Sequence, residues 1–267
     1  MHPMLALHAL IRLHSPAILC LHSVGPGLDA MPASTFRSLL DGLLERGYQF
    51  LTADDVIRAG VLRRTLLLTF DDGRQDNFDV VLPILREYRI RATFYVCPGL
   101  AGKHAAFASH PDCDDAASGN LVFEIMNWDV LRQLRDSGMC IGSHTANHPD
   151  LTQCPEEQLD QEIAGSKAAL ERQLQVPIHH FSYPWGRFNA RVLRRVRAAG
   201  YKTAAAVSVN PLSPIRPWDA FTLPRVTAHP AAAPEELLRS IAFPNMFRRA
   251  LSQTRRLTPS PVWSGIS

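Results

Sequence analysis

The 267-residue chain is predicted to fold as an α/β protein with a mainly parallel sheet. Short apolar runs alternate with longer amphipathic segments along most of its length, which is the pattern of repeated strand and helix units. Hydrophobic residues make up 46% of the sequence and charged residues 20%, so the chain can bury a substantial core. Polar clusters follow several of the apolar runs. They indicate where a site would lie, because ligands bind at the carboxyl ends of parallel strands.

The apolar runs and the helical patterns give the expected elements in chain order. Strands are expected at residues 17–22, 65–70, 92–96, 139–144, 179–184, 202–209 and 223–228. Helices are expected at residues 36–47, 77–89, 128–138, 155–174 and 190–200. Asn127 is a predicted N-cap, Gly138 a predicted helix stop and Pro155 a predicted first helical residue. The long polar stretch 99–124 is expected to be a loop that covers the site, since such loops in compact domains are often functional.

The chain divides by composition into a short lead, one domain and a basic tail. We assign residues 1–16 to the lead, 17–230 to the domain and 231–267 to a helical tail. The tail carries Arg248, Arg249, Arg255 and Arg256 beside apolar residues, a pattern that can lie on an anionic membrane surface. A frayed or packed terminal helix explains it equally well.

Charge and hydropathy exclude several classes of protein. A net charge of +3 with interspersed charges gives no support for nucleic-acid binding, and no apolar run is long enough to span a bilayer. The first residues lack the features of a secretory signal, because His8, Arg12 and His14 interrupt the apolar stretch. We therefore expect a cytoplasmic protein, at most in contact with the inner face of the membrane.

The five cysteines form no Cys-x-x-Cys pair and are odd in number. We expect reduced and mostly buried thiols. Cys113, in the polar segment HPDCDD, could bind a metal or be a free surface thiol.

Two adjacent acids, Asp71 and Asp72, end the apolar run TLLLTF and are followed by Gly73. A strand that stops at Asp-Gly places both carboxylates at its carboxyl end. Asp-Asp-Gly is also ordinary turn composition, so a plain turn is the alternative.

A pair of histidines follows another predicted strand. His144 and His148 enclose the sequence HTANH, with Gly142 before it and Pro149 after it. The flanking Gly and Pro favour a turn that directs both rings toward one point, although a structural histidine pair is the alternative. Two histidines and one carboxylate leave an open position on a zinc-like ion, as in hydrolytic sites. One acid would then bind the ion, and its neighbour would accept a proton from water.

A third segment, FSYPWGRFN at residues 181–189, combines aromatic side chains with Pro184 and Gly186. Such a loop can fix backbone N–H groups for an oxyanion and offer a sugar ring a flat surface. An ordinary aromatic turn is the alternative.

Taken in order, TFDDG, HTANH and SYPWG resemble the motifs of the NodB-type polysaccharide deacetylases of carbohydrate esterase family four. The resemblance also includes ILCLHSVG, DNFDVVLPILREYRIRATFYV and MNWDVLRQLRDSGMCIGSHTANHPDL, and it covers residues 17–228. It implies a distorted (β/α) barrel and a hydrolase that removes the N-acetyl group from an amino sugar. The substrate would be an oligosaccharide, a polysaccharide or an activated glycan precursor.

The resemblance also assigns residues and a cofactor. It implies a divalent ion, Zn²⁺ foremost with Co²⁺, Ni²⁺ or Fe²⁺ as alternatives, and Asp71 as general base. The metal ligands would be Asp72, His144 and His148. The backbone N–H of Trp185 matches the oxyanion donor, within a substrate-binding segment that comprises Tyr183, Pro184, Trp185 and Gly186.

The sequence departs from the family pattern at two places. Ser182 stands where many members carry an arginine that orients the catalytic aspartate, and Arg225 in LPRV either supplies that charge or is a plain arginine at the core rim. The family motif Leu-x-His, which holds the general acid, is missing near the C-terminus, where His229 is the nearest candidate. In some branches the motif lies near the N-terminus, and LCLH ending at His22 fits it. We expect His22 to be the acid, because it ends a predicted strand.

Two other functions remain open at this stage. A related enzyme could hydrolyse a different C–N bond, such as a cyclic amide in the manner of allantoinase-like members. A catalytically silent homologue could keep the fold and bind carbohydrate. The complete Asp-Asp and His-x-x-x-His sets favour the deacetylase.

Overall fold

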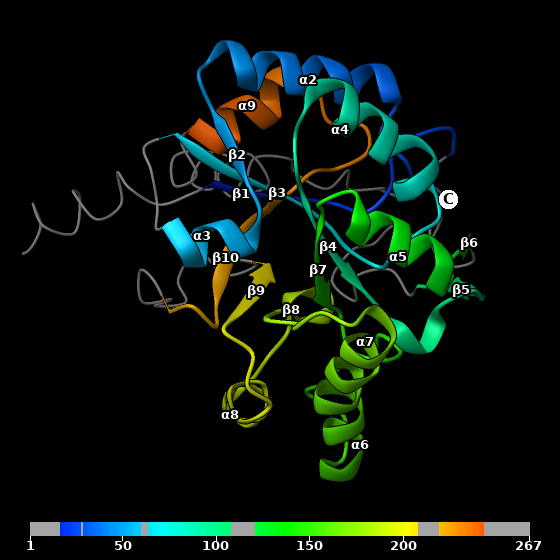
Figure 1. Cartoon of the computed structure of the whole chain (residues 1–267). Helices are drawn as coiled ribbons and strands as arrows, with labels where there is room; N and C mark the ends of the chain where they lie inside the picture. The colour runs from blue at the N-terminus through cyan, green and yellow to red at the C-terminus, as the bar shows by residue number, and fades with distance from the viewer. Residues whose placement is uncertain (1–16, 28, 60–63, 108–120, 208–218, 243–267) are drawn as a thin grey trace, which may run out of the picture.

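The computed structural model describes residues 17–27, 29–59, 64–107, 121–207 and 219–242, and it confirms the predicted barrel. Parallel strands form a closed ring in the order β1, β10, β9, β8, β7, β4 and β3, and β3 pairs again with β1 (Figure 1). The strands of the ring are β1 (Ala17–Leu21), β3 (Thr65–Phe70), β4 (Thr93–Val96), β7 (Cys140–Ser143), β8 (His180–Ser182), β9 (Thr203–Val207) and β10 (Leu223–Thr227). All of them overlap the strands expected from the sequence.

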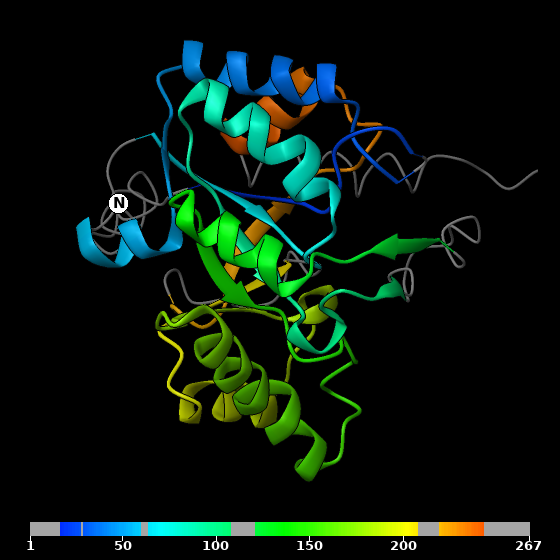
Figure 2. The same ribbon diagram turned by 45° about the vertical axis from the view of Figure 1, so that its right-hand side comes forward.

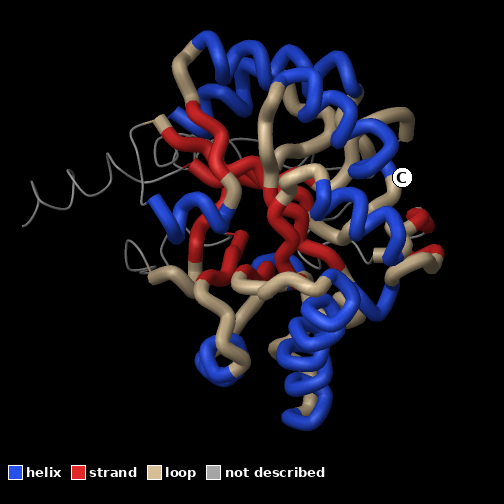
Figure 3. Tube along the Cα trace, viewed as in Figure 1, coloured by secondary structure: helices blue, strands red, loops and turns tan. Residues whose placement is uncertain are grey.

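Helices surround this ring, as Figure 3 shows with strands in red and helices in blue. They are α2 (Ala33–Glu45), α3 (Ala53–Ala59), α4 (Leu82–Tyr88), α5 (Trp128–Asp136), α6 (Glu156–Asp160), α7 (Ser166–Leu174), α8 (Ala190–Ala198) and α9 (Pro234–Ala242). The main core lies between the ring and these helices, where leucine, isoleucine and phenylalanine side chains are almost fully buried. Among the described residues, no helix combines the length and the hydropathy that a bilayer crossing requires.

Two of the expected helices contain a π-helical turn. Asn77–Val81 forms one before α4, and Gln161–Gly165 forms another between α6 and α7. The helix that the sequence places at residues 128–138 is regular, and the side chain of Asn127 accepts a hydrogen bond from the Val130 N–H, as expected of an N-cap. Three-residue 3₁₀ turns occupy Pro98–Leu100 and Pro184–Gly186.

Strand β2 and helix α3 were not expected from the sequence, and they distort the barrel. Strand β2 (Gln49–Leu51) pairs with the first half of β3, at residues 65–67, whereas β4 pairs with Thr69 and Phe70 at its end. Helix α3 follows β2 directly, and the Ala53 N–H donates a hydrogen bond to the Thr93 hydroxyl at the start of β4. The β2–α3 unit therefore fills the gap where β3 and β4 separate.

The stretch expected as a long loop contains an antiparallel hairpin of β5 (His104–Ala106) and β6 (Val122–Glu124). Figure 2 shows this hairpin extending from the side of the barrel, away from the ring of helices. Residues 108–120, including Cys113, lie outside the described residues. The four described cysteines are unpaired and buried, as expected.

Helix α9 falls within the segment expected as a tail. It packs against α2, where Leu237, Leu238 and Ile241 are buried and Gly42 makes room for Leu238. The basic residues from Arg248 onward lie outside the described residues, so the expected membrane contact stays a prediction.

The interior of the ring depends on Gly142 in β7. A Cβ atom at this position would lie 2.5 Å from Cδ1 of Tyr95, whose ring is buried inside the barrel, and 3.0 Å from the His180 carbonyl oxygen. We predict that Gly142→Ala destabilises the protein by about 1–3 kcal/mol, because the backbone oxygen cannot move aside as a side chain could.

Gly165→Ala is the matched control for this prediction. Gly165 has helical φ and ψ angles, and its added Cβ would make only an ordinary contact at 3.8 Å. The same substitution should therefore stabilise the protein by up to about 1 kcal/mol. Urea unfolding of both variants measures the two effects, and equal effects at the two positions would contradict this account of the interior.

Candidate active site

Six side chains singled out in the sequence come together at the carboxyl ends of the strands. Asp71 and Asp72 follow β3, and their carboxylates are almost fully buried, each residue being 2% exposed. The other four are His22 after β1, His144 and His148 after β7, and Arg225 within β10. Parallel strands bring these distant segments to one rim, as the sequence predicts.

The Asp71 carboxylate is held by a two-pronged ion pair with Arg225. Nη1 and Nη2 of Arg225 donate to Oδ1 and Oδ2 of Asp71 at 2.8 and 2.7 Å. The Ser182 hydroxyl donates to the same carboxylate at 3.0 Å and accepts a hydrogen bond from Arg225 at 2.9 Å. Burial alone would raise the pKa of Asp71, but the charge and hydrogen bonds of Arg225 together with the nearby His144 and His22 outweigh it and hold the pKa below its usual range. Asp71 is therefore a fixed, charged carboxylate.

The Asp72 carboxylate has a different counter-ion. Nε and Nη2 of Arg74 lie 3.1 and 3.0 Å from Oδ2 of Asp72, while Nη1 of Arg74 binds Asp29 at 2.9 Å. Burial alone would raise the pKa of Asp72. The charge of Arg74 and the nearby imidazoles lower it by more, so the net shift of the pKa is downward. This contact occupies Oδ2 and leaves Oδ1 facing the two histidines.

His144 is oriented by a hydrogen bond on the far side of its ring. Its Nδ1 lies 2.8 Å from the Ser182 carbonyl oxygen, which can only accept, so the proton is on Nδ1. Nε2 is then the lone-pair nitrogen, and it lies 3.7 Å from Oδ1 of Asp72. Metal-binding histidines usually have such a second partner, which fixes the tautomer and the ring orientation.

The loop between the two histidines is fixed by a buried acid. Glu162 accepts hydrogen bonds from the backbone N–H and the side-chain amide of Asn147 at 2.8 and 2.9 Å. The His148 N–H donates to the Thr145 hydroxyl at 2.9 Å, and both residues adopt left-handed φ angles, 61° and 65°. Such angles are costly outside glycine, so the tight turn depends on these contacts. Burial, together with the nearby His144, lowers the pKa of His148 to about 3, which keeps its ring neutral.

Asp72, His144 and His148 form a donor set that fits a divalent transition metal. One oxygen and two nitrogens of these residues lie within 4.8 Å of one another. Nε2 of each histidine is 3.7 Å from Oδ1 of Asp72, close to the spacing of about 3.4 Å that bonds of about 2.0–2.2 Å give in a tetrahedral set. Two imidazoles and one carboxylate match the ligands of hydrolytic zinc sites.

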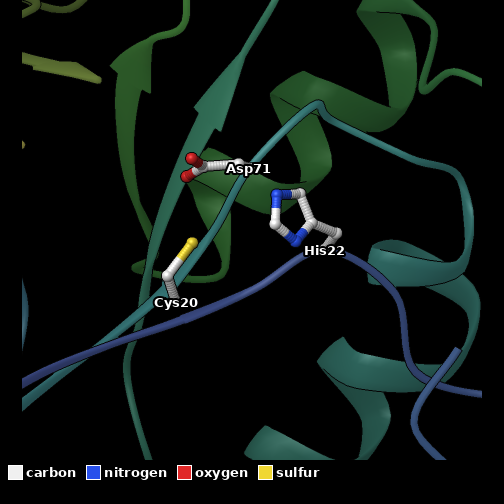
Figure 4. A group of neighbouring side chains, drawn as sticks. All are labelled: Cys20, His22 and Asp71. Atoms are coloured by element: carbon white, nitrogen blue, oxygen red, sulfur yellow. The ribbon is translucent and has the colours of Figure 1, made fainter. Parts of the chain in front are cut away.

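His22 lies beside Asp71, as Figure 4 shows together with Cys20. Ligand atoms of Cys20, His22 and Asp71 are all within 4.8 Å of one another. Burial lowers the pKa of His22, although the two acids oppose the shift. His229, the alternative acid, is exposed, and its Nδ1 accepts a hydrogen bond from the Ala231 N–H. The structure thus brings His22, and not His229, to the buried acids.

The third motif contributes one partly exposed ring and one buried ring. Trp185 adopts a left-handed φ of 52° in the 3₁₀ turn, and its ring stands edge-on to His148 at 4.6 Å. Tyr183 is fully buried, stacks on Phe188 and donates its hydroxyl proton to the Phe221 carbonyl. The Tyr183 ring is therefore part of the core, and the expected role of this residue in substrate binding stays a prediction that only its backbone could fulfil. Pro184 and Gly186 are also buried, and Gly186 lies directly against Val207.

The β5–β6 hairpin is attached to the first motif. Backbone hydrogen bonds join Gln75 to Glu124 and Met126 to Gly73. The Arg74 guanidinium lies 3.6 Å from the Phe123 ring centre, and the Phe107 ring packs edge-on against His148 at 5.0 Å. The described part of the stretch expected to cover the site therefore lies at the active rim, and not on the opposite face.

Three residues of this site were missed in the sequence. Arg74 directly follows Asp-Asp-Gly, and this position could have identified it as a counter-ion of the two acids. Glu162 could not be predicted, because an acid in an amphipathic helix is expected on the surface. The hydropathy pattern also does not show the π turn in which Glu162 lies. Phe107 lay in a stretch read as polar.

The sequence model of the polysaccharide deacetylase family matches residues 59–204. The Bacillus subtilis protein YxkH is 26% identical over 234 residues, which are 83% of this chain and 75% of YxkH. A chitooligosaccharide deacetylase of Rhizobium leguminosarum bv. trifolii is 31% identical over 146 residues, which are 54% of this chain and 57% of that protein.

A solved structure is similar over a larger share of the chain. The Streptococcus pyogenes deacetylase PplD, solved in complex with acetate, matches with a TM-score of 0.67 and 26% identity. The match covers 85% of this chain and 97% of PplD. The barrel and most of its connections are therefore shared with a deacetylase.

The Arg225–Asp71 pair generates a stability prediction. Arg225→Met removes the counter-ion and leaves a buried, charged carboxylate, which should cost about 3–5 kcal/mol of unfolding free energy. Asp71→Asn in the same chain removes that unpaired charge, so the double variant should lose less than the sum of the single losses. Urea unfolding of the four proteins measures the coupling, and additive losses would show that the two side chains do not depend on each other.

Proposed function

Because the chain belongs to the polysaccharide deacetylase family, we propose that it is a metal-dependent hydrolase that removes the N-acetyl group from an amino sugar. The observation that carries the proposal is the convergence of Asp72, His144 and His148 around one point, with the charged Asp71 next to it. The named relatives, a chitooligosaccharide deacetylase and a peptidoglycan-N-acetylglucosamine deacetylase, support the same chemistry.

Asp72, His144 and His148 would hold the ion, which supplies Lewis acidity to polarise the acetyl carbonyl and to acidify water. Asp71, held in its charged form by Arg225, would accept the proton of the attacking water. His22, beside Asp71, would pass to the leaving amine the proton that Asp71 takes from the water. The backbone N–H of Trp185 would stabilise the oxyanion, and the rings of Trp185 and Phe107 beside His148 would border the sugar.

We also propose a cytoplasmic location, and the proposed substrate class depends on it. We propose a soluble oligosaccharide, a nucleotide-linked sugar or a lipid-linked glycan precursor in preference to assembled cell-wall polymer. A lipid-linked substrate would suit contact of the basic tail with the inner face of the membrane.

An acetate-release screen of the purified protein against these three substrate classes tests the proposal. The protein is assayed after its metal content has been measured, and again after chelation and reloading with Zn²⁺ or Co²⁺. Acetate release from one class that disappears on chelation supports an N-deacetylase. Release of a different product from a cyclic amide would indicate the related C–N hydrolase. Carbohydrate binding without any turnover by the loaded protein would indicate a silent homologue.

The two adjacent acids should separate metal binding from catalysis. Asp72→Ala should lose both the metal and the activity, because it removes a ligand. Asp71→Asn should keep the metal, while turnover falls by about 10²–10⁴-fold, the usual contribution of a general base. Metal content and acetate release measured on the same samples check this, and loss of the metal from Asp71→Asn would reverse the assignment.

The proposed acid can be separated from its alternative in the same way. His22→Ala should retain the metal and lose turnover to a similar degree, because His22 lies beside Asp71. His229→Ala is the control and should change little, since His229 is exposed at the surface. A large loss in His229→Ala with a small one in His22→Ala would contradict the proposal.

Arg74 should act on the metal through Asp72. Arg74→Gln removes the charge that holds Oδ2 of Asp72, so we expect metal affinity to fall by about 10–100-fold, the usual effect of a ligand's hydrogen-bond partner. Arg74→Lys should recover part of the affinity, because lysine keeps the positive charge but cannot make the two parallel hydrogen bonds of a guanidinium. Competition titration with a chelating dye measures both, and unchanged affinity in Arg74→Gln would remove this role.

A further inference from the structure

A second group of metal-binding side chains lies at the opposite end of the barrel. Cys140 and His180 are the first residues of β7 and β8, and Asp54 is the second residue of α3. One sulfur, one nitrogen and one oxygen of these residues lie within 4.8 Å of one another. The catalytic residues follow the carboxyl ends of the same strands, so the barrel separates the two groups.

The three side chains are arranged as ligands of one ion would be. His180 and Cys140 are buried, at 1% and 5% exposure, and Nε2 of His180 lies 3.1 Å from Oδ1 of Asp54. Nδ1 of His180 lies 2.8 Å from the Thr203 hydroxyl, on the far side of the ring. A carboxylate oxygen only accepts, so Nε2 donates its proton to Asp54 in the metal-free protein. Binding of an ion by Nε2 therefore requires the ring proton to move to Nδ1, where the Thr203 hydroxyl can accept it. The Ser182 carbonyl has the same place beside His144, although a carbonyl can only accept, whereas the Thr203 hydroxyl can also donate.

A cavity of about 340 Å³ adjoins this group and gives access to it. Its wall includes Asp54 and Cys140, and also Arg58, His179 and Lys202. A fourth coordination position would open into this space, as in zinc sites with three protein ligands. Nη2 of Arg58 lies 3.8 Å from Oδ2 of Asp54 and opposes a metal ion, whereas the carboxylate and the thiolate together offset the charge of a divalent ion.

We propose that Asp54, Cys140 and His180 form a second binding site for a Zn²⁺-type ion, independent of the catalytic site. Burial raises the pKa of Cys140 to about 12 in the metal-free protein, so the thiol proton must leave to solvent when the sulfur binds the ion. The bound ion would tie α3, which belongs to the inserted β2–α3 unit, to β7 and β8 of the ring. Its role would be to stabilise the part of the barrel where β3 and β4 separate.

The thiolate makes the site distinguishable from the catalytic one by spectroscopy. Titration of the 267-residue protein with Co²⁺ should reach two equivalents and produce a sulfur-to-cobalt charge-transfer band in the near ultraviolet. His148→Ala should reduce the stoichiometry to one and keep the band, because the catalytic donor set contains no sulfur. Cys140→Ser should also bind one equivalent but lose the band.

Cys20→Ser is the matched control, because Cys20 is a buried thiol beside the catalytic acids and could itself bind cobalt. It should keep the band at full intensity. Absence of the band from the wild-type protein, or its loss in Cys20→Ser with retention in Cys140→Ser, would overturn the proposal.

A measurement on His148→Ala covers the case in which Cys140→Ser does not fold. Addition of Zn²⁺ should raise the melting temperature of His148→Ala, because the ion binds only the native state. His148→Ala combined with His180→Gln should show no such rise. An unchanged melting temperature of His148→Ala at saturating Zn²⁺ would also overturn the second site. A failure of acetate release would affect only the proposed function.

Discussion

The burial of two adjacent carboxylates is the constraint on which the rest of the active rim depends. Asp71 and Asp72 are neighbours in the chain, and each would be strongly destabilised without a counter-charge. The structure separates them by turning the chain at Asp72, whose φ is 74°, and by giving each acid its own arginine. Arg225 approaches from inside the barrel, and Arg74 from the rim. One carboxylate is thereby fixed beside His22, and the other presents a single oxygen to the two histidines.

Much of this arrangement could be predicted from the sequence, and the limits have physical causes. The ring strands were visible because buried parallel strands are continuous apolar runs, and the site followed because their ends share one rim. Strand β2 was not predicted, because a strand of three residues is too short to show a hydrophobic periodicity. For Arg225 the sequence allowed two interpretations, a partner of Asp71 or a plain arginine at the core rim. Local sequence patterns do not show which strands face each other across the interior of a barrel.

Other parts of the site could not be predicted because they depend on tertiary contacts. Glu162 lies in a π turn and accepts hydrogen bonds from Asn147. Tyr183 was grouped with the substrate-binding residues of its loop, but its ring packs into the core beneath that loop. Sequence spacing identified which segments meet at the rim, whereas the direction of each side chain depended on packing from elements distant in the chain.

The closure of the ring has a consequence for how the protein is made. Strand β10 completes the ring by pairing with β1 and β9, and it also carries Arg225, which lies 154 positions after Asp71. A ribosome releases the amino-terminal segments first, so most of the ring strands emerge before this counter-ion exists. Until then β1 and β9 have open edges, and Asp71 must remain in water. Nascent chains that end before β10 would therefore expose strand edges to aggregation and chaperone binding, and complete synthesis is coupled to the assembly of the active rim.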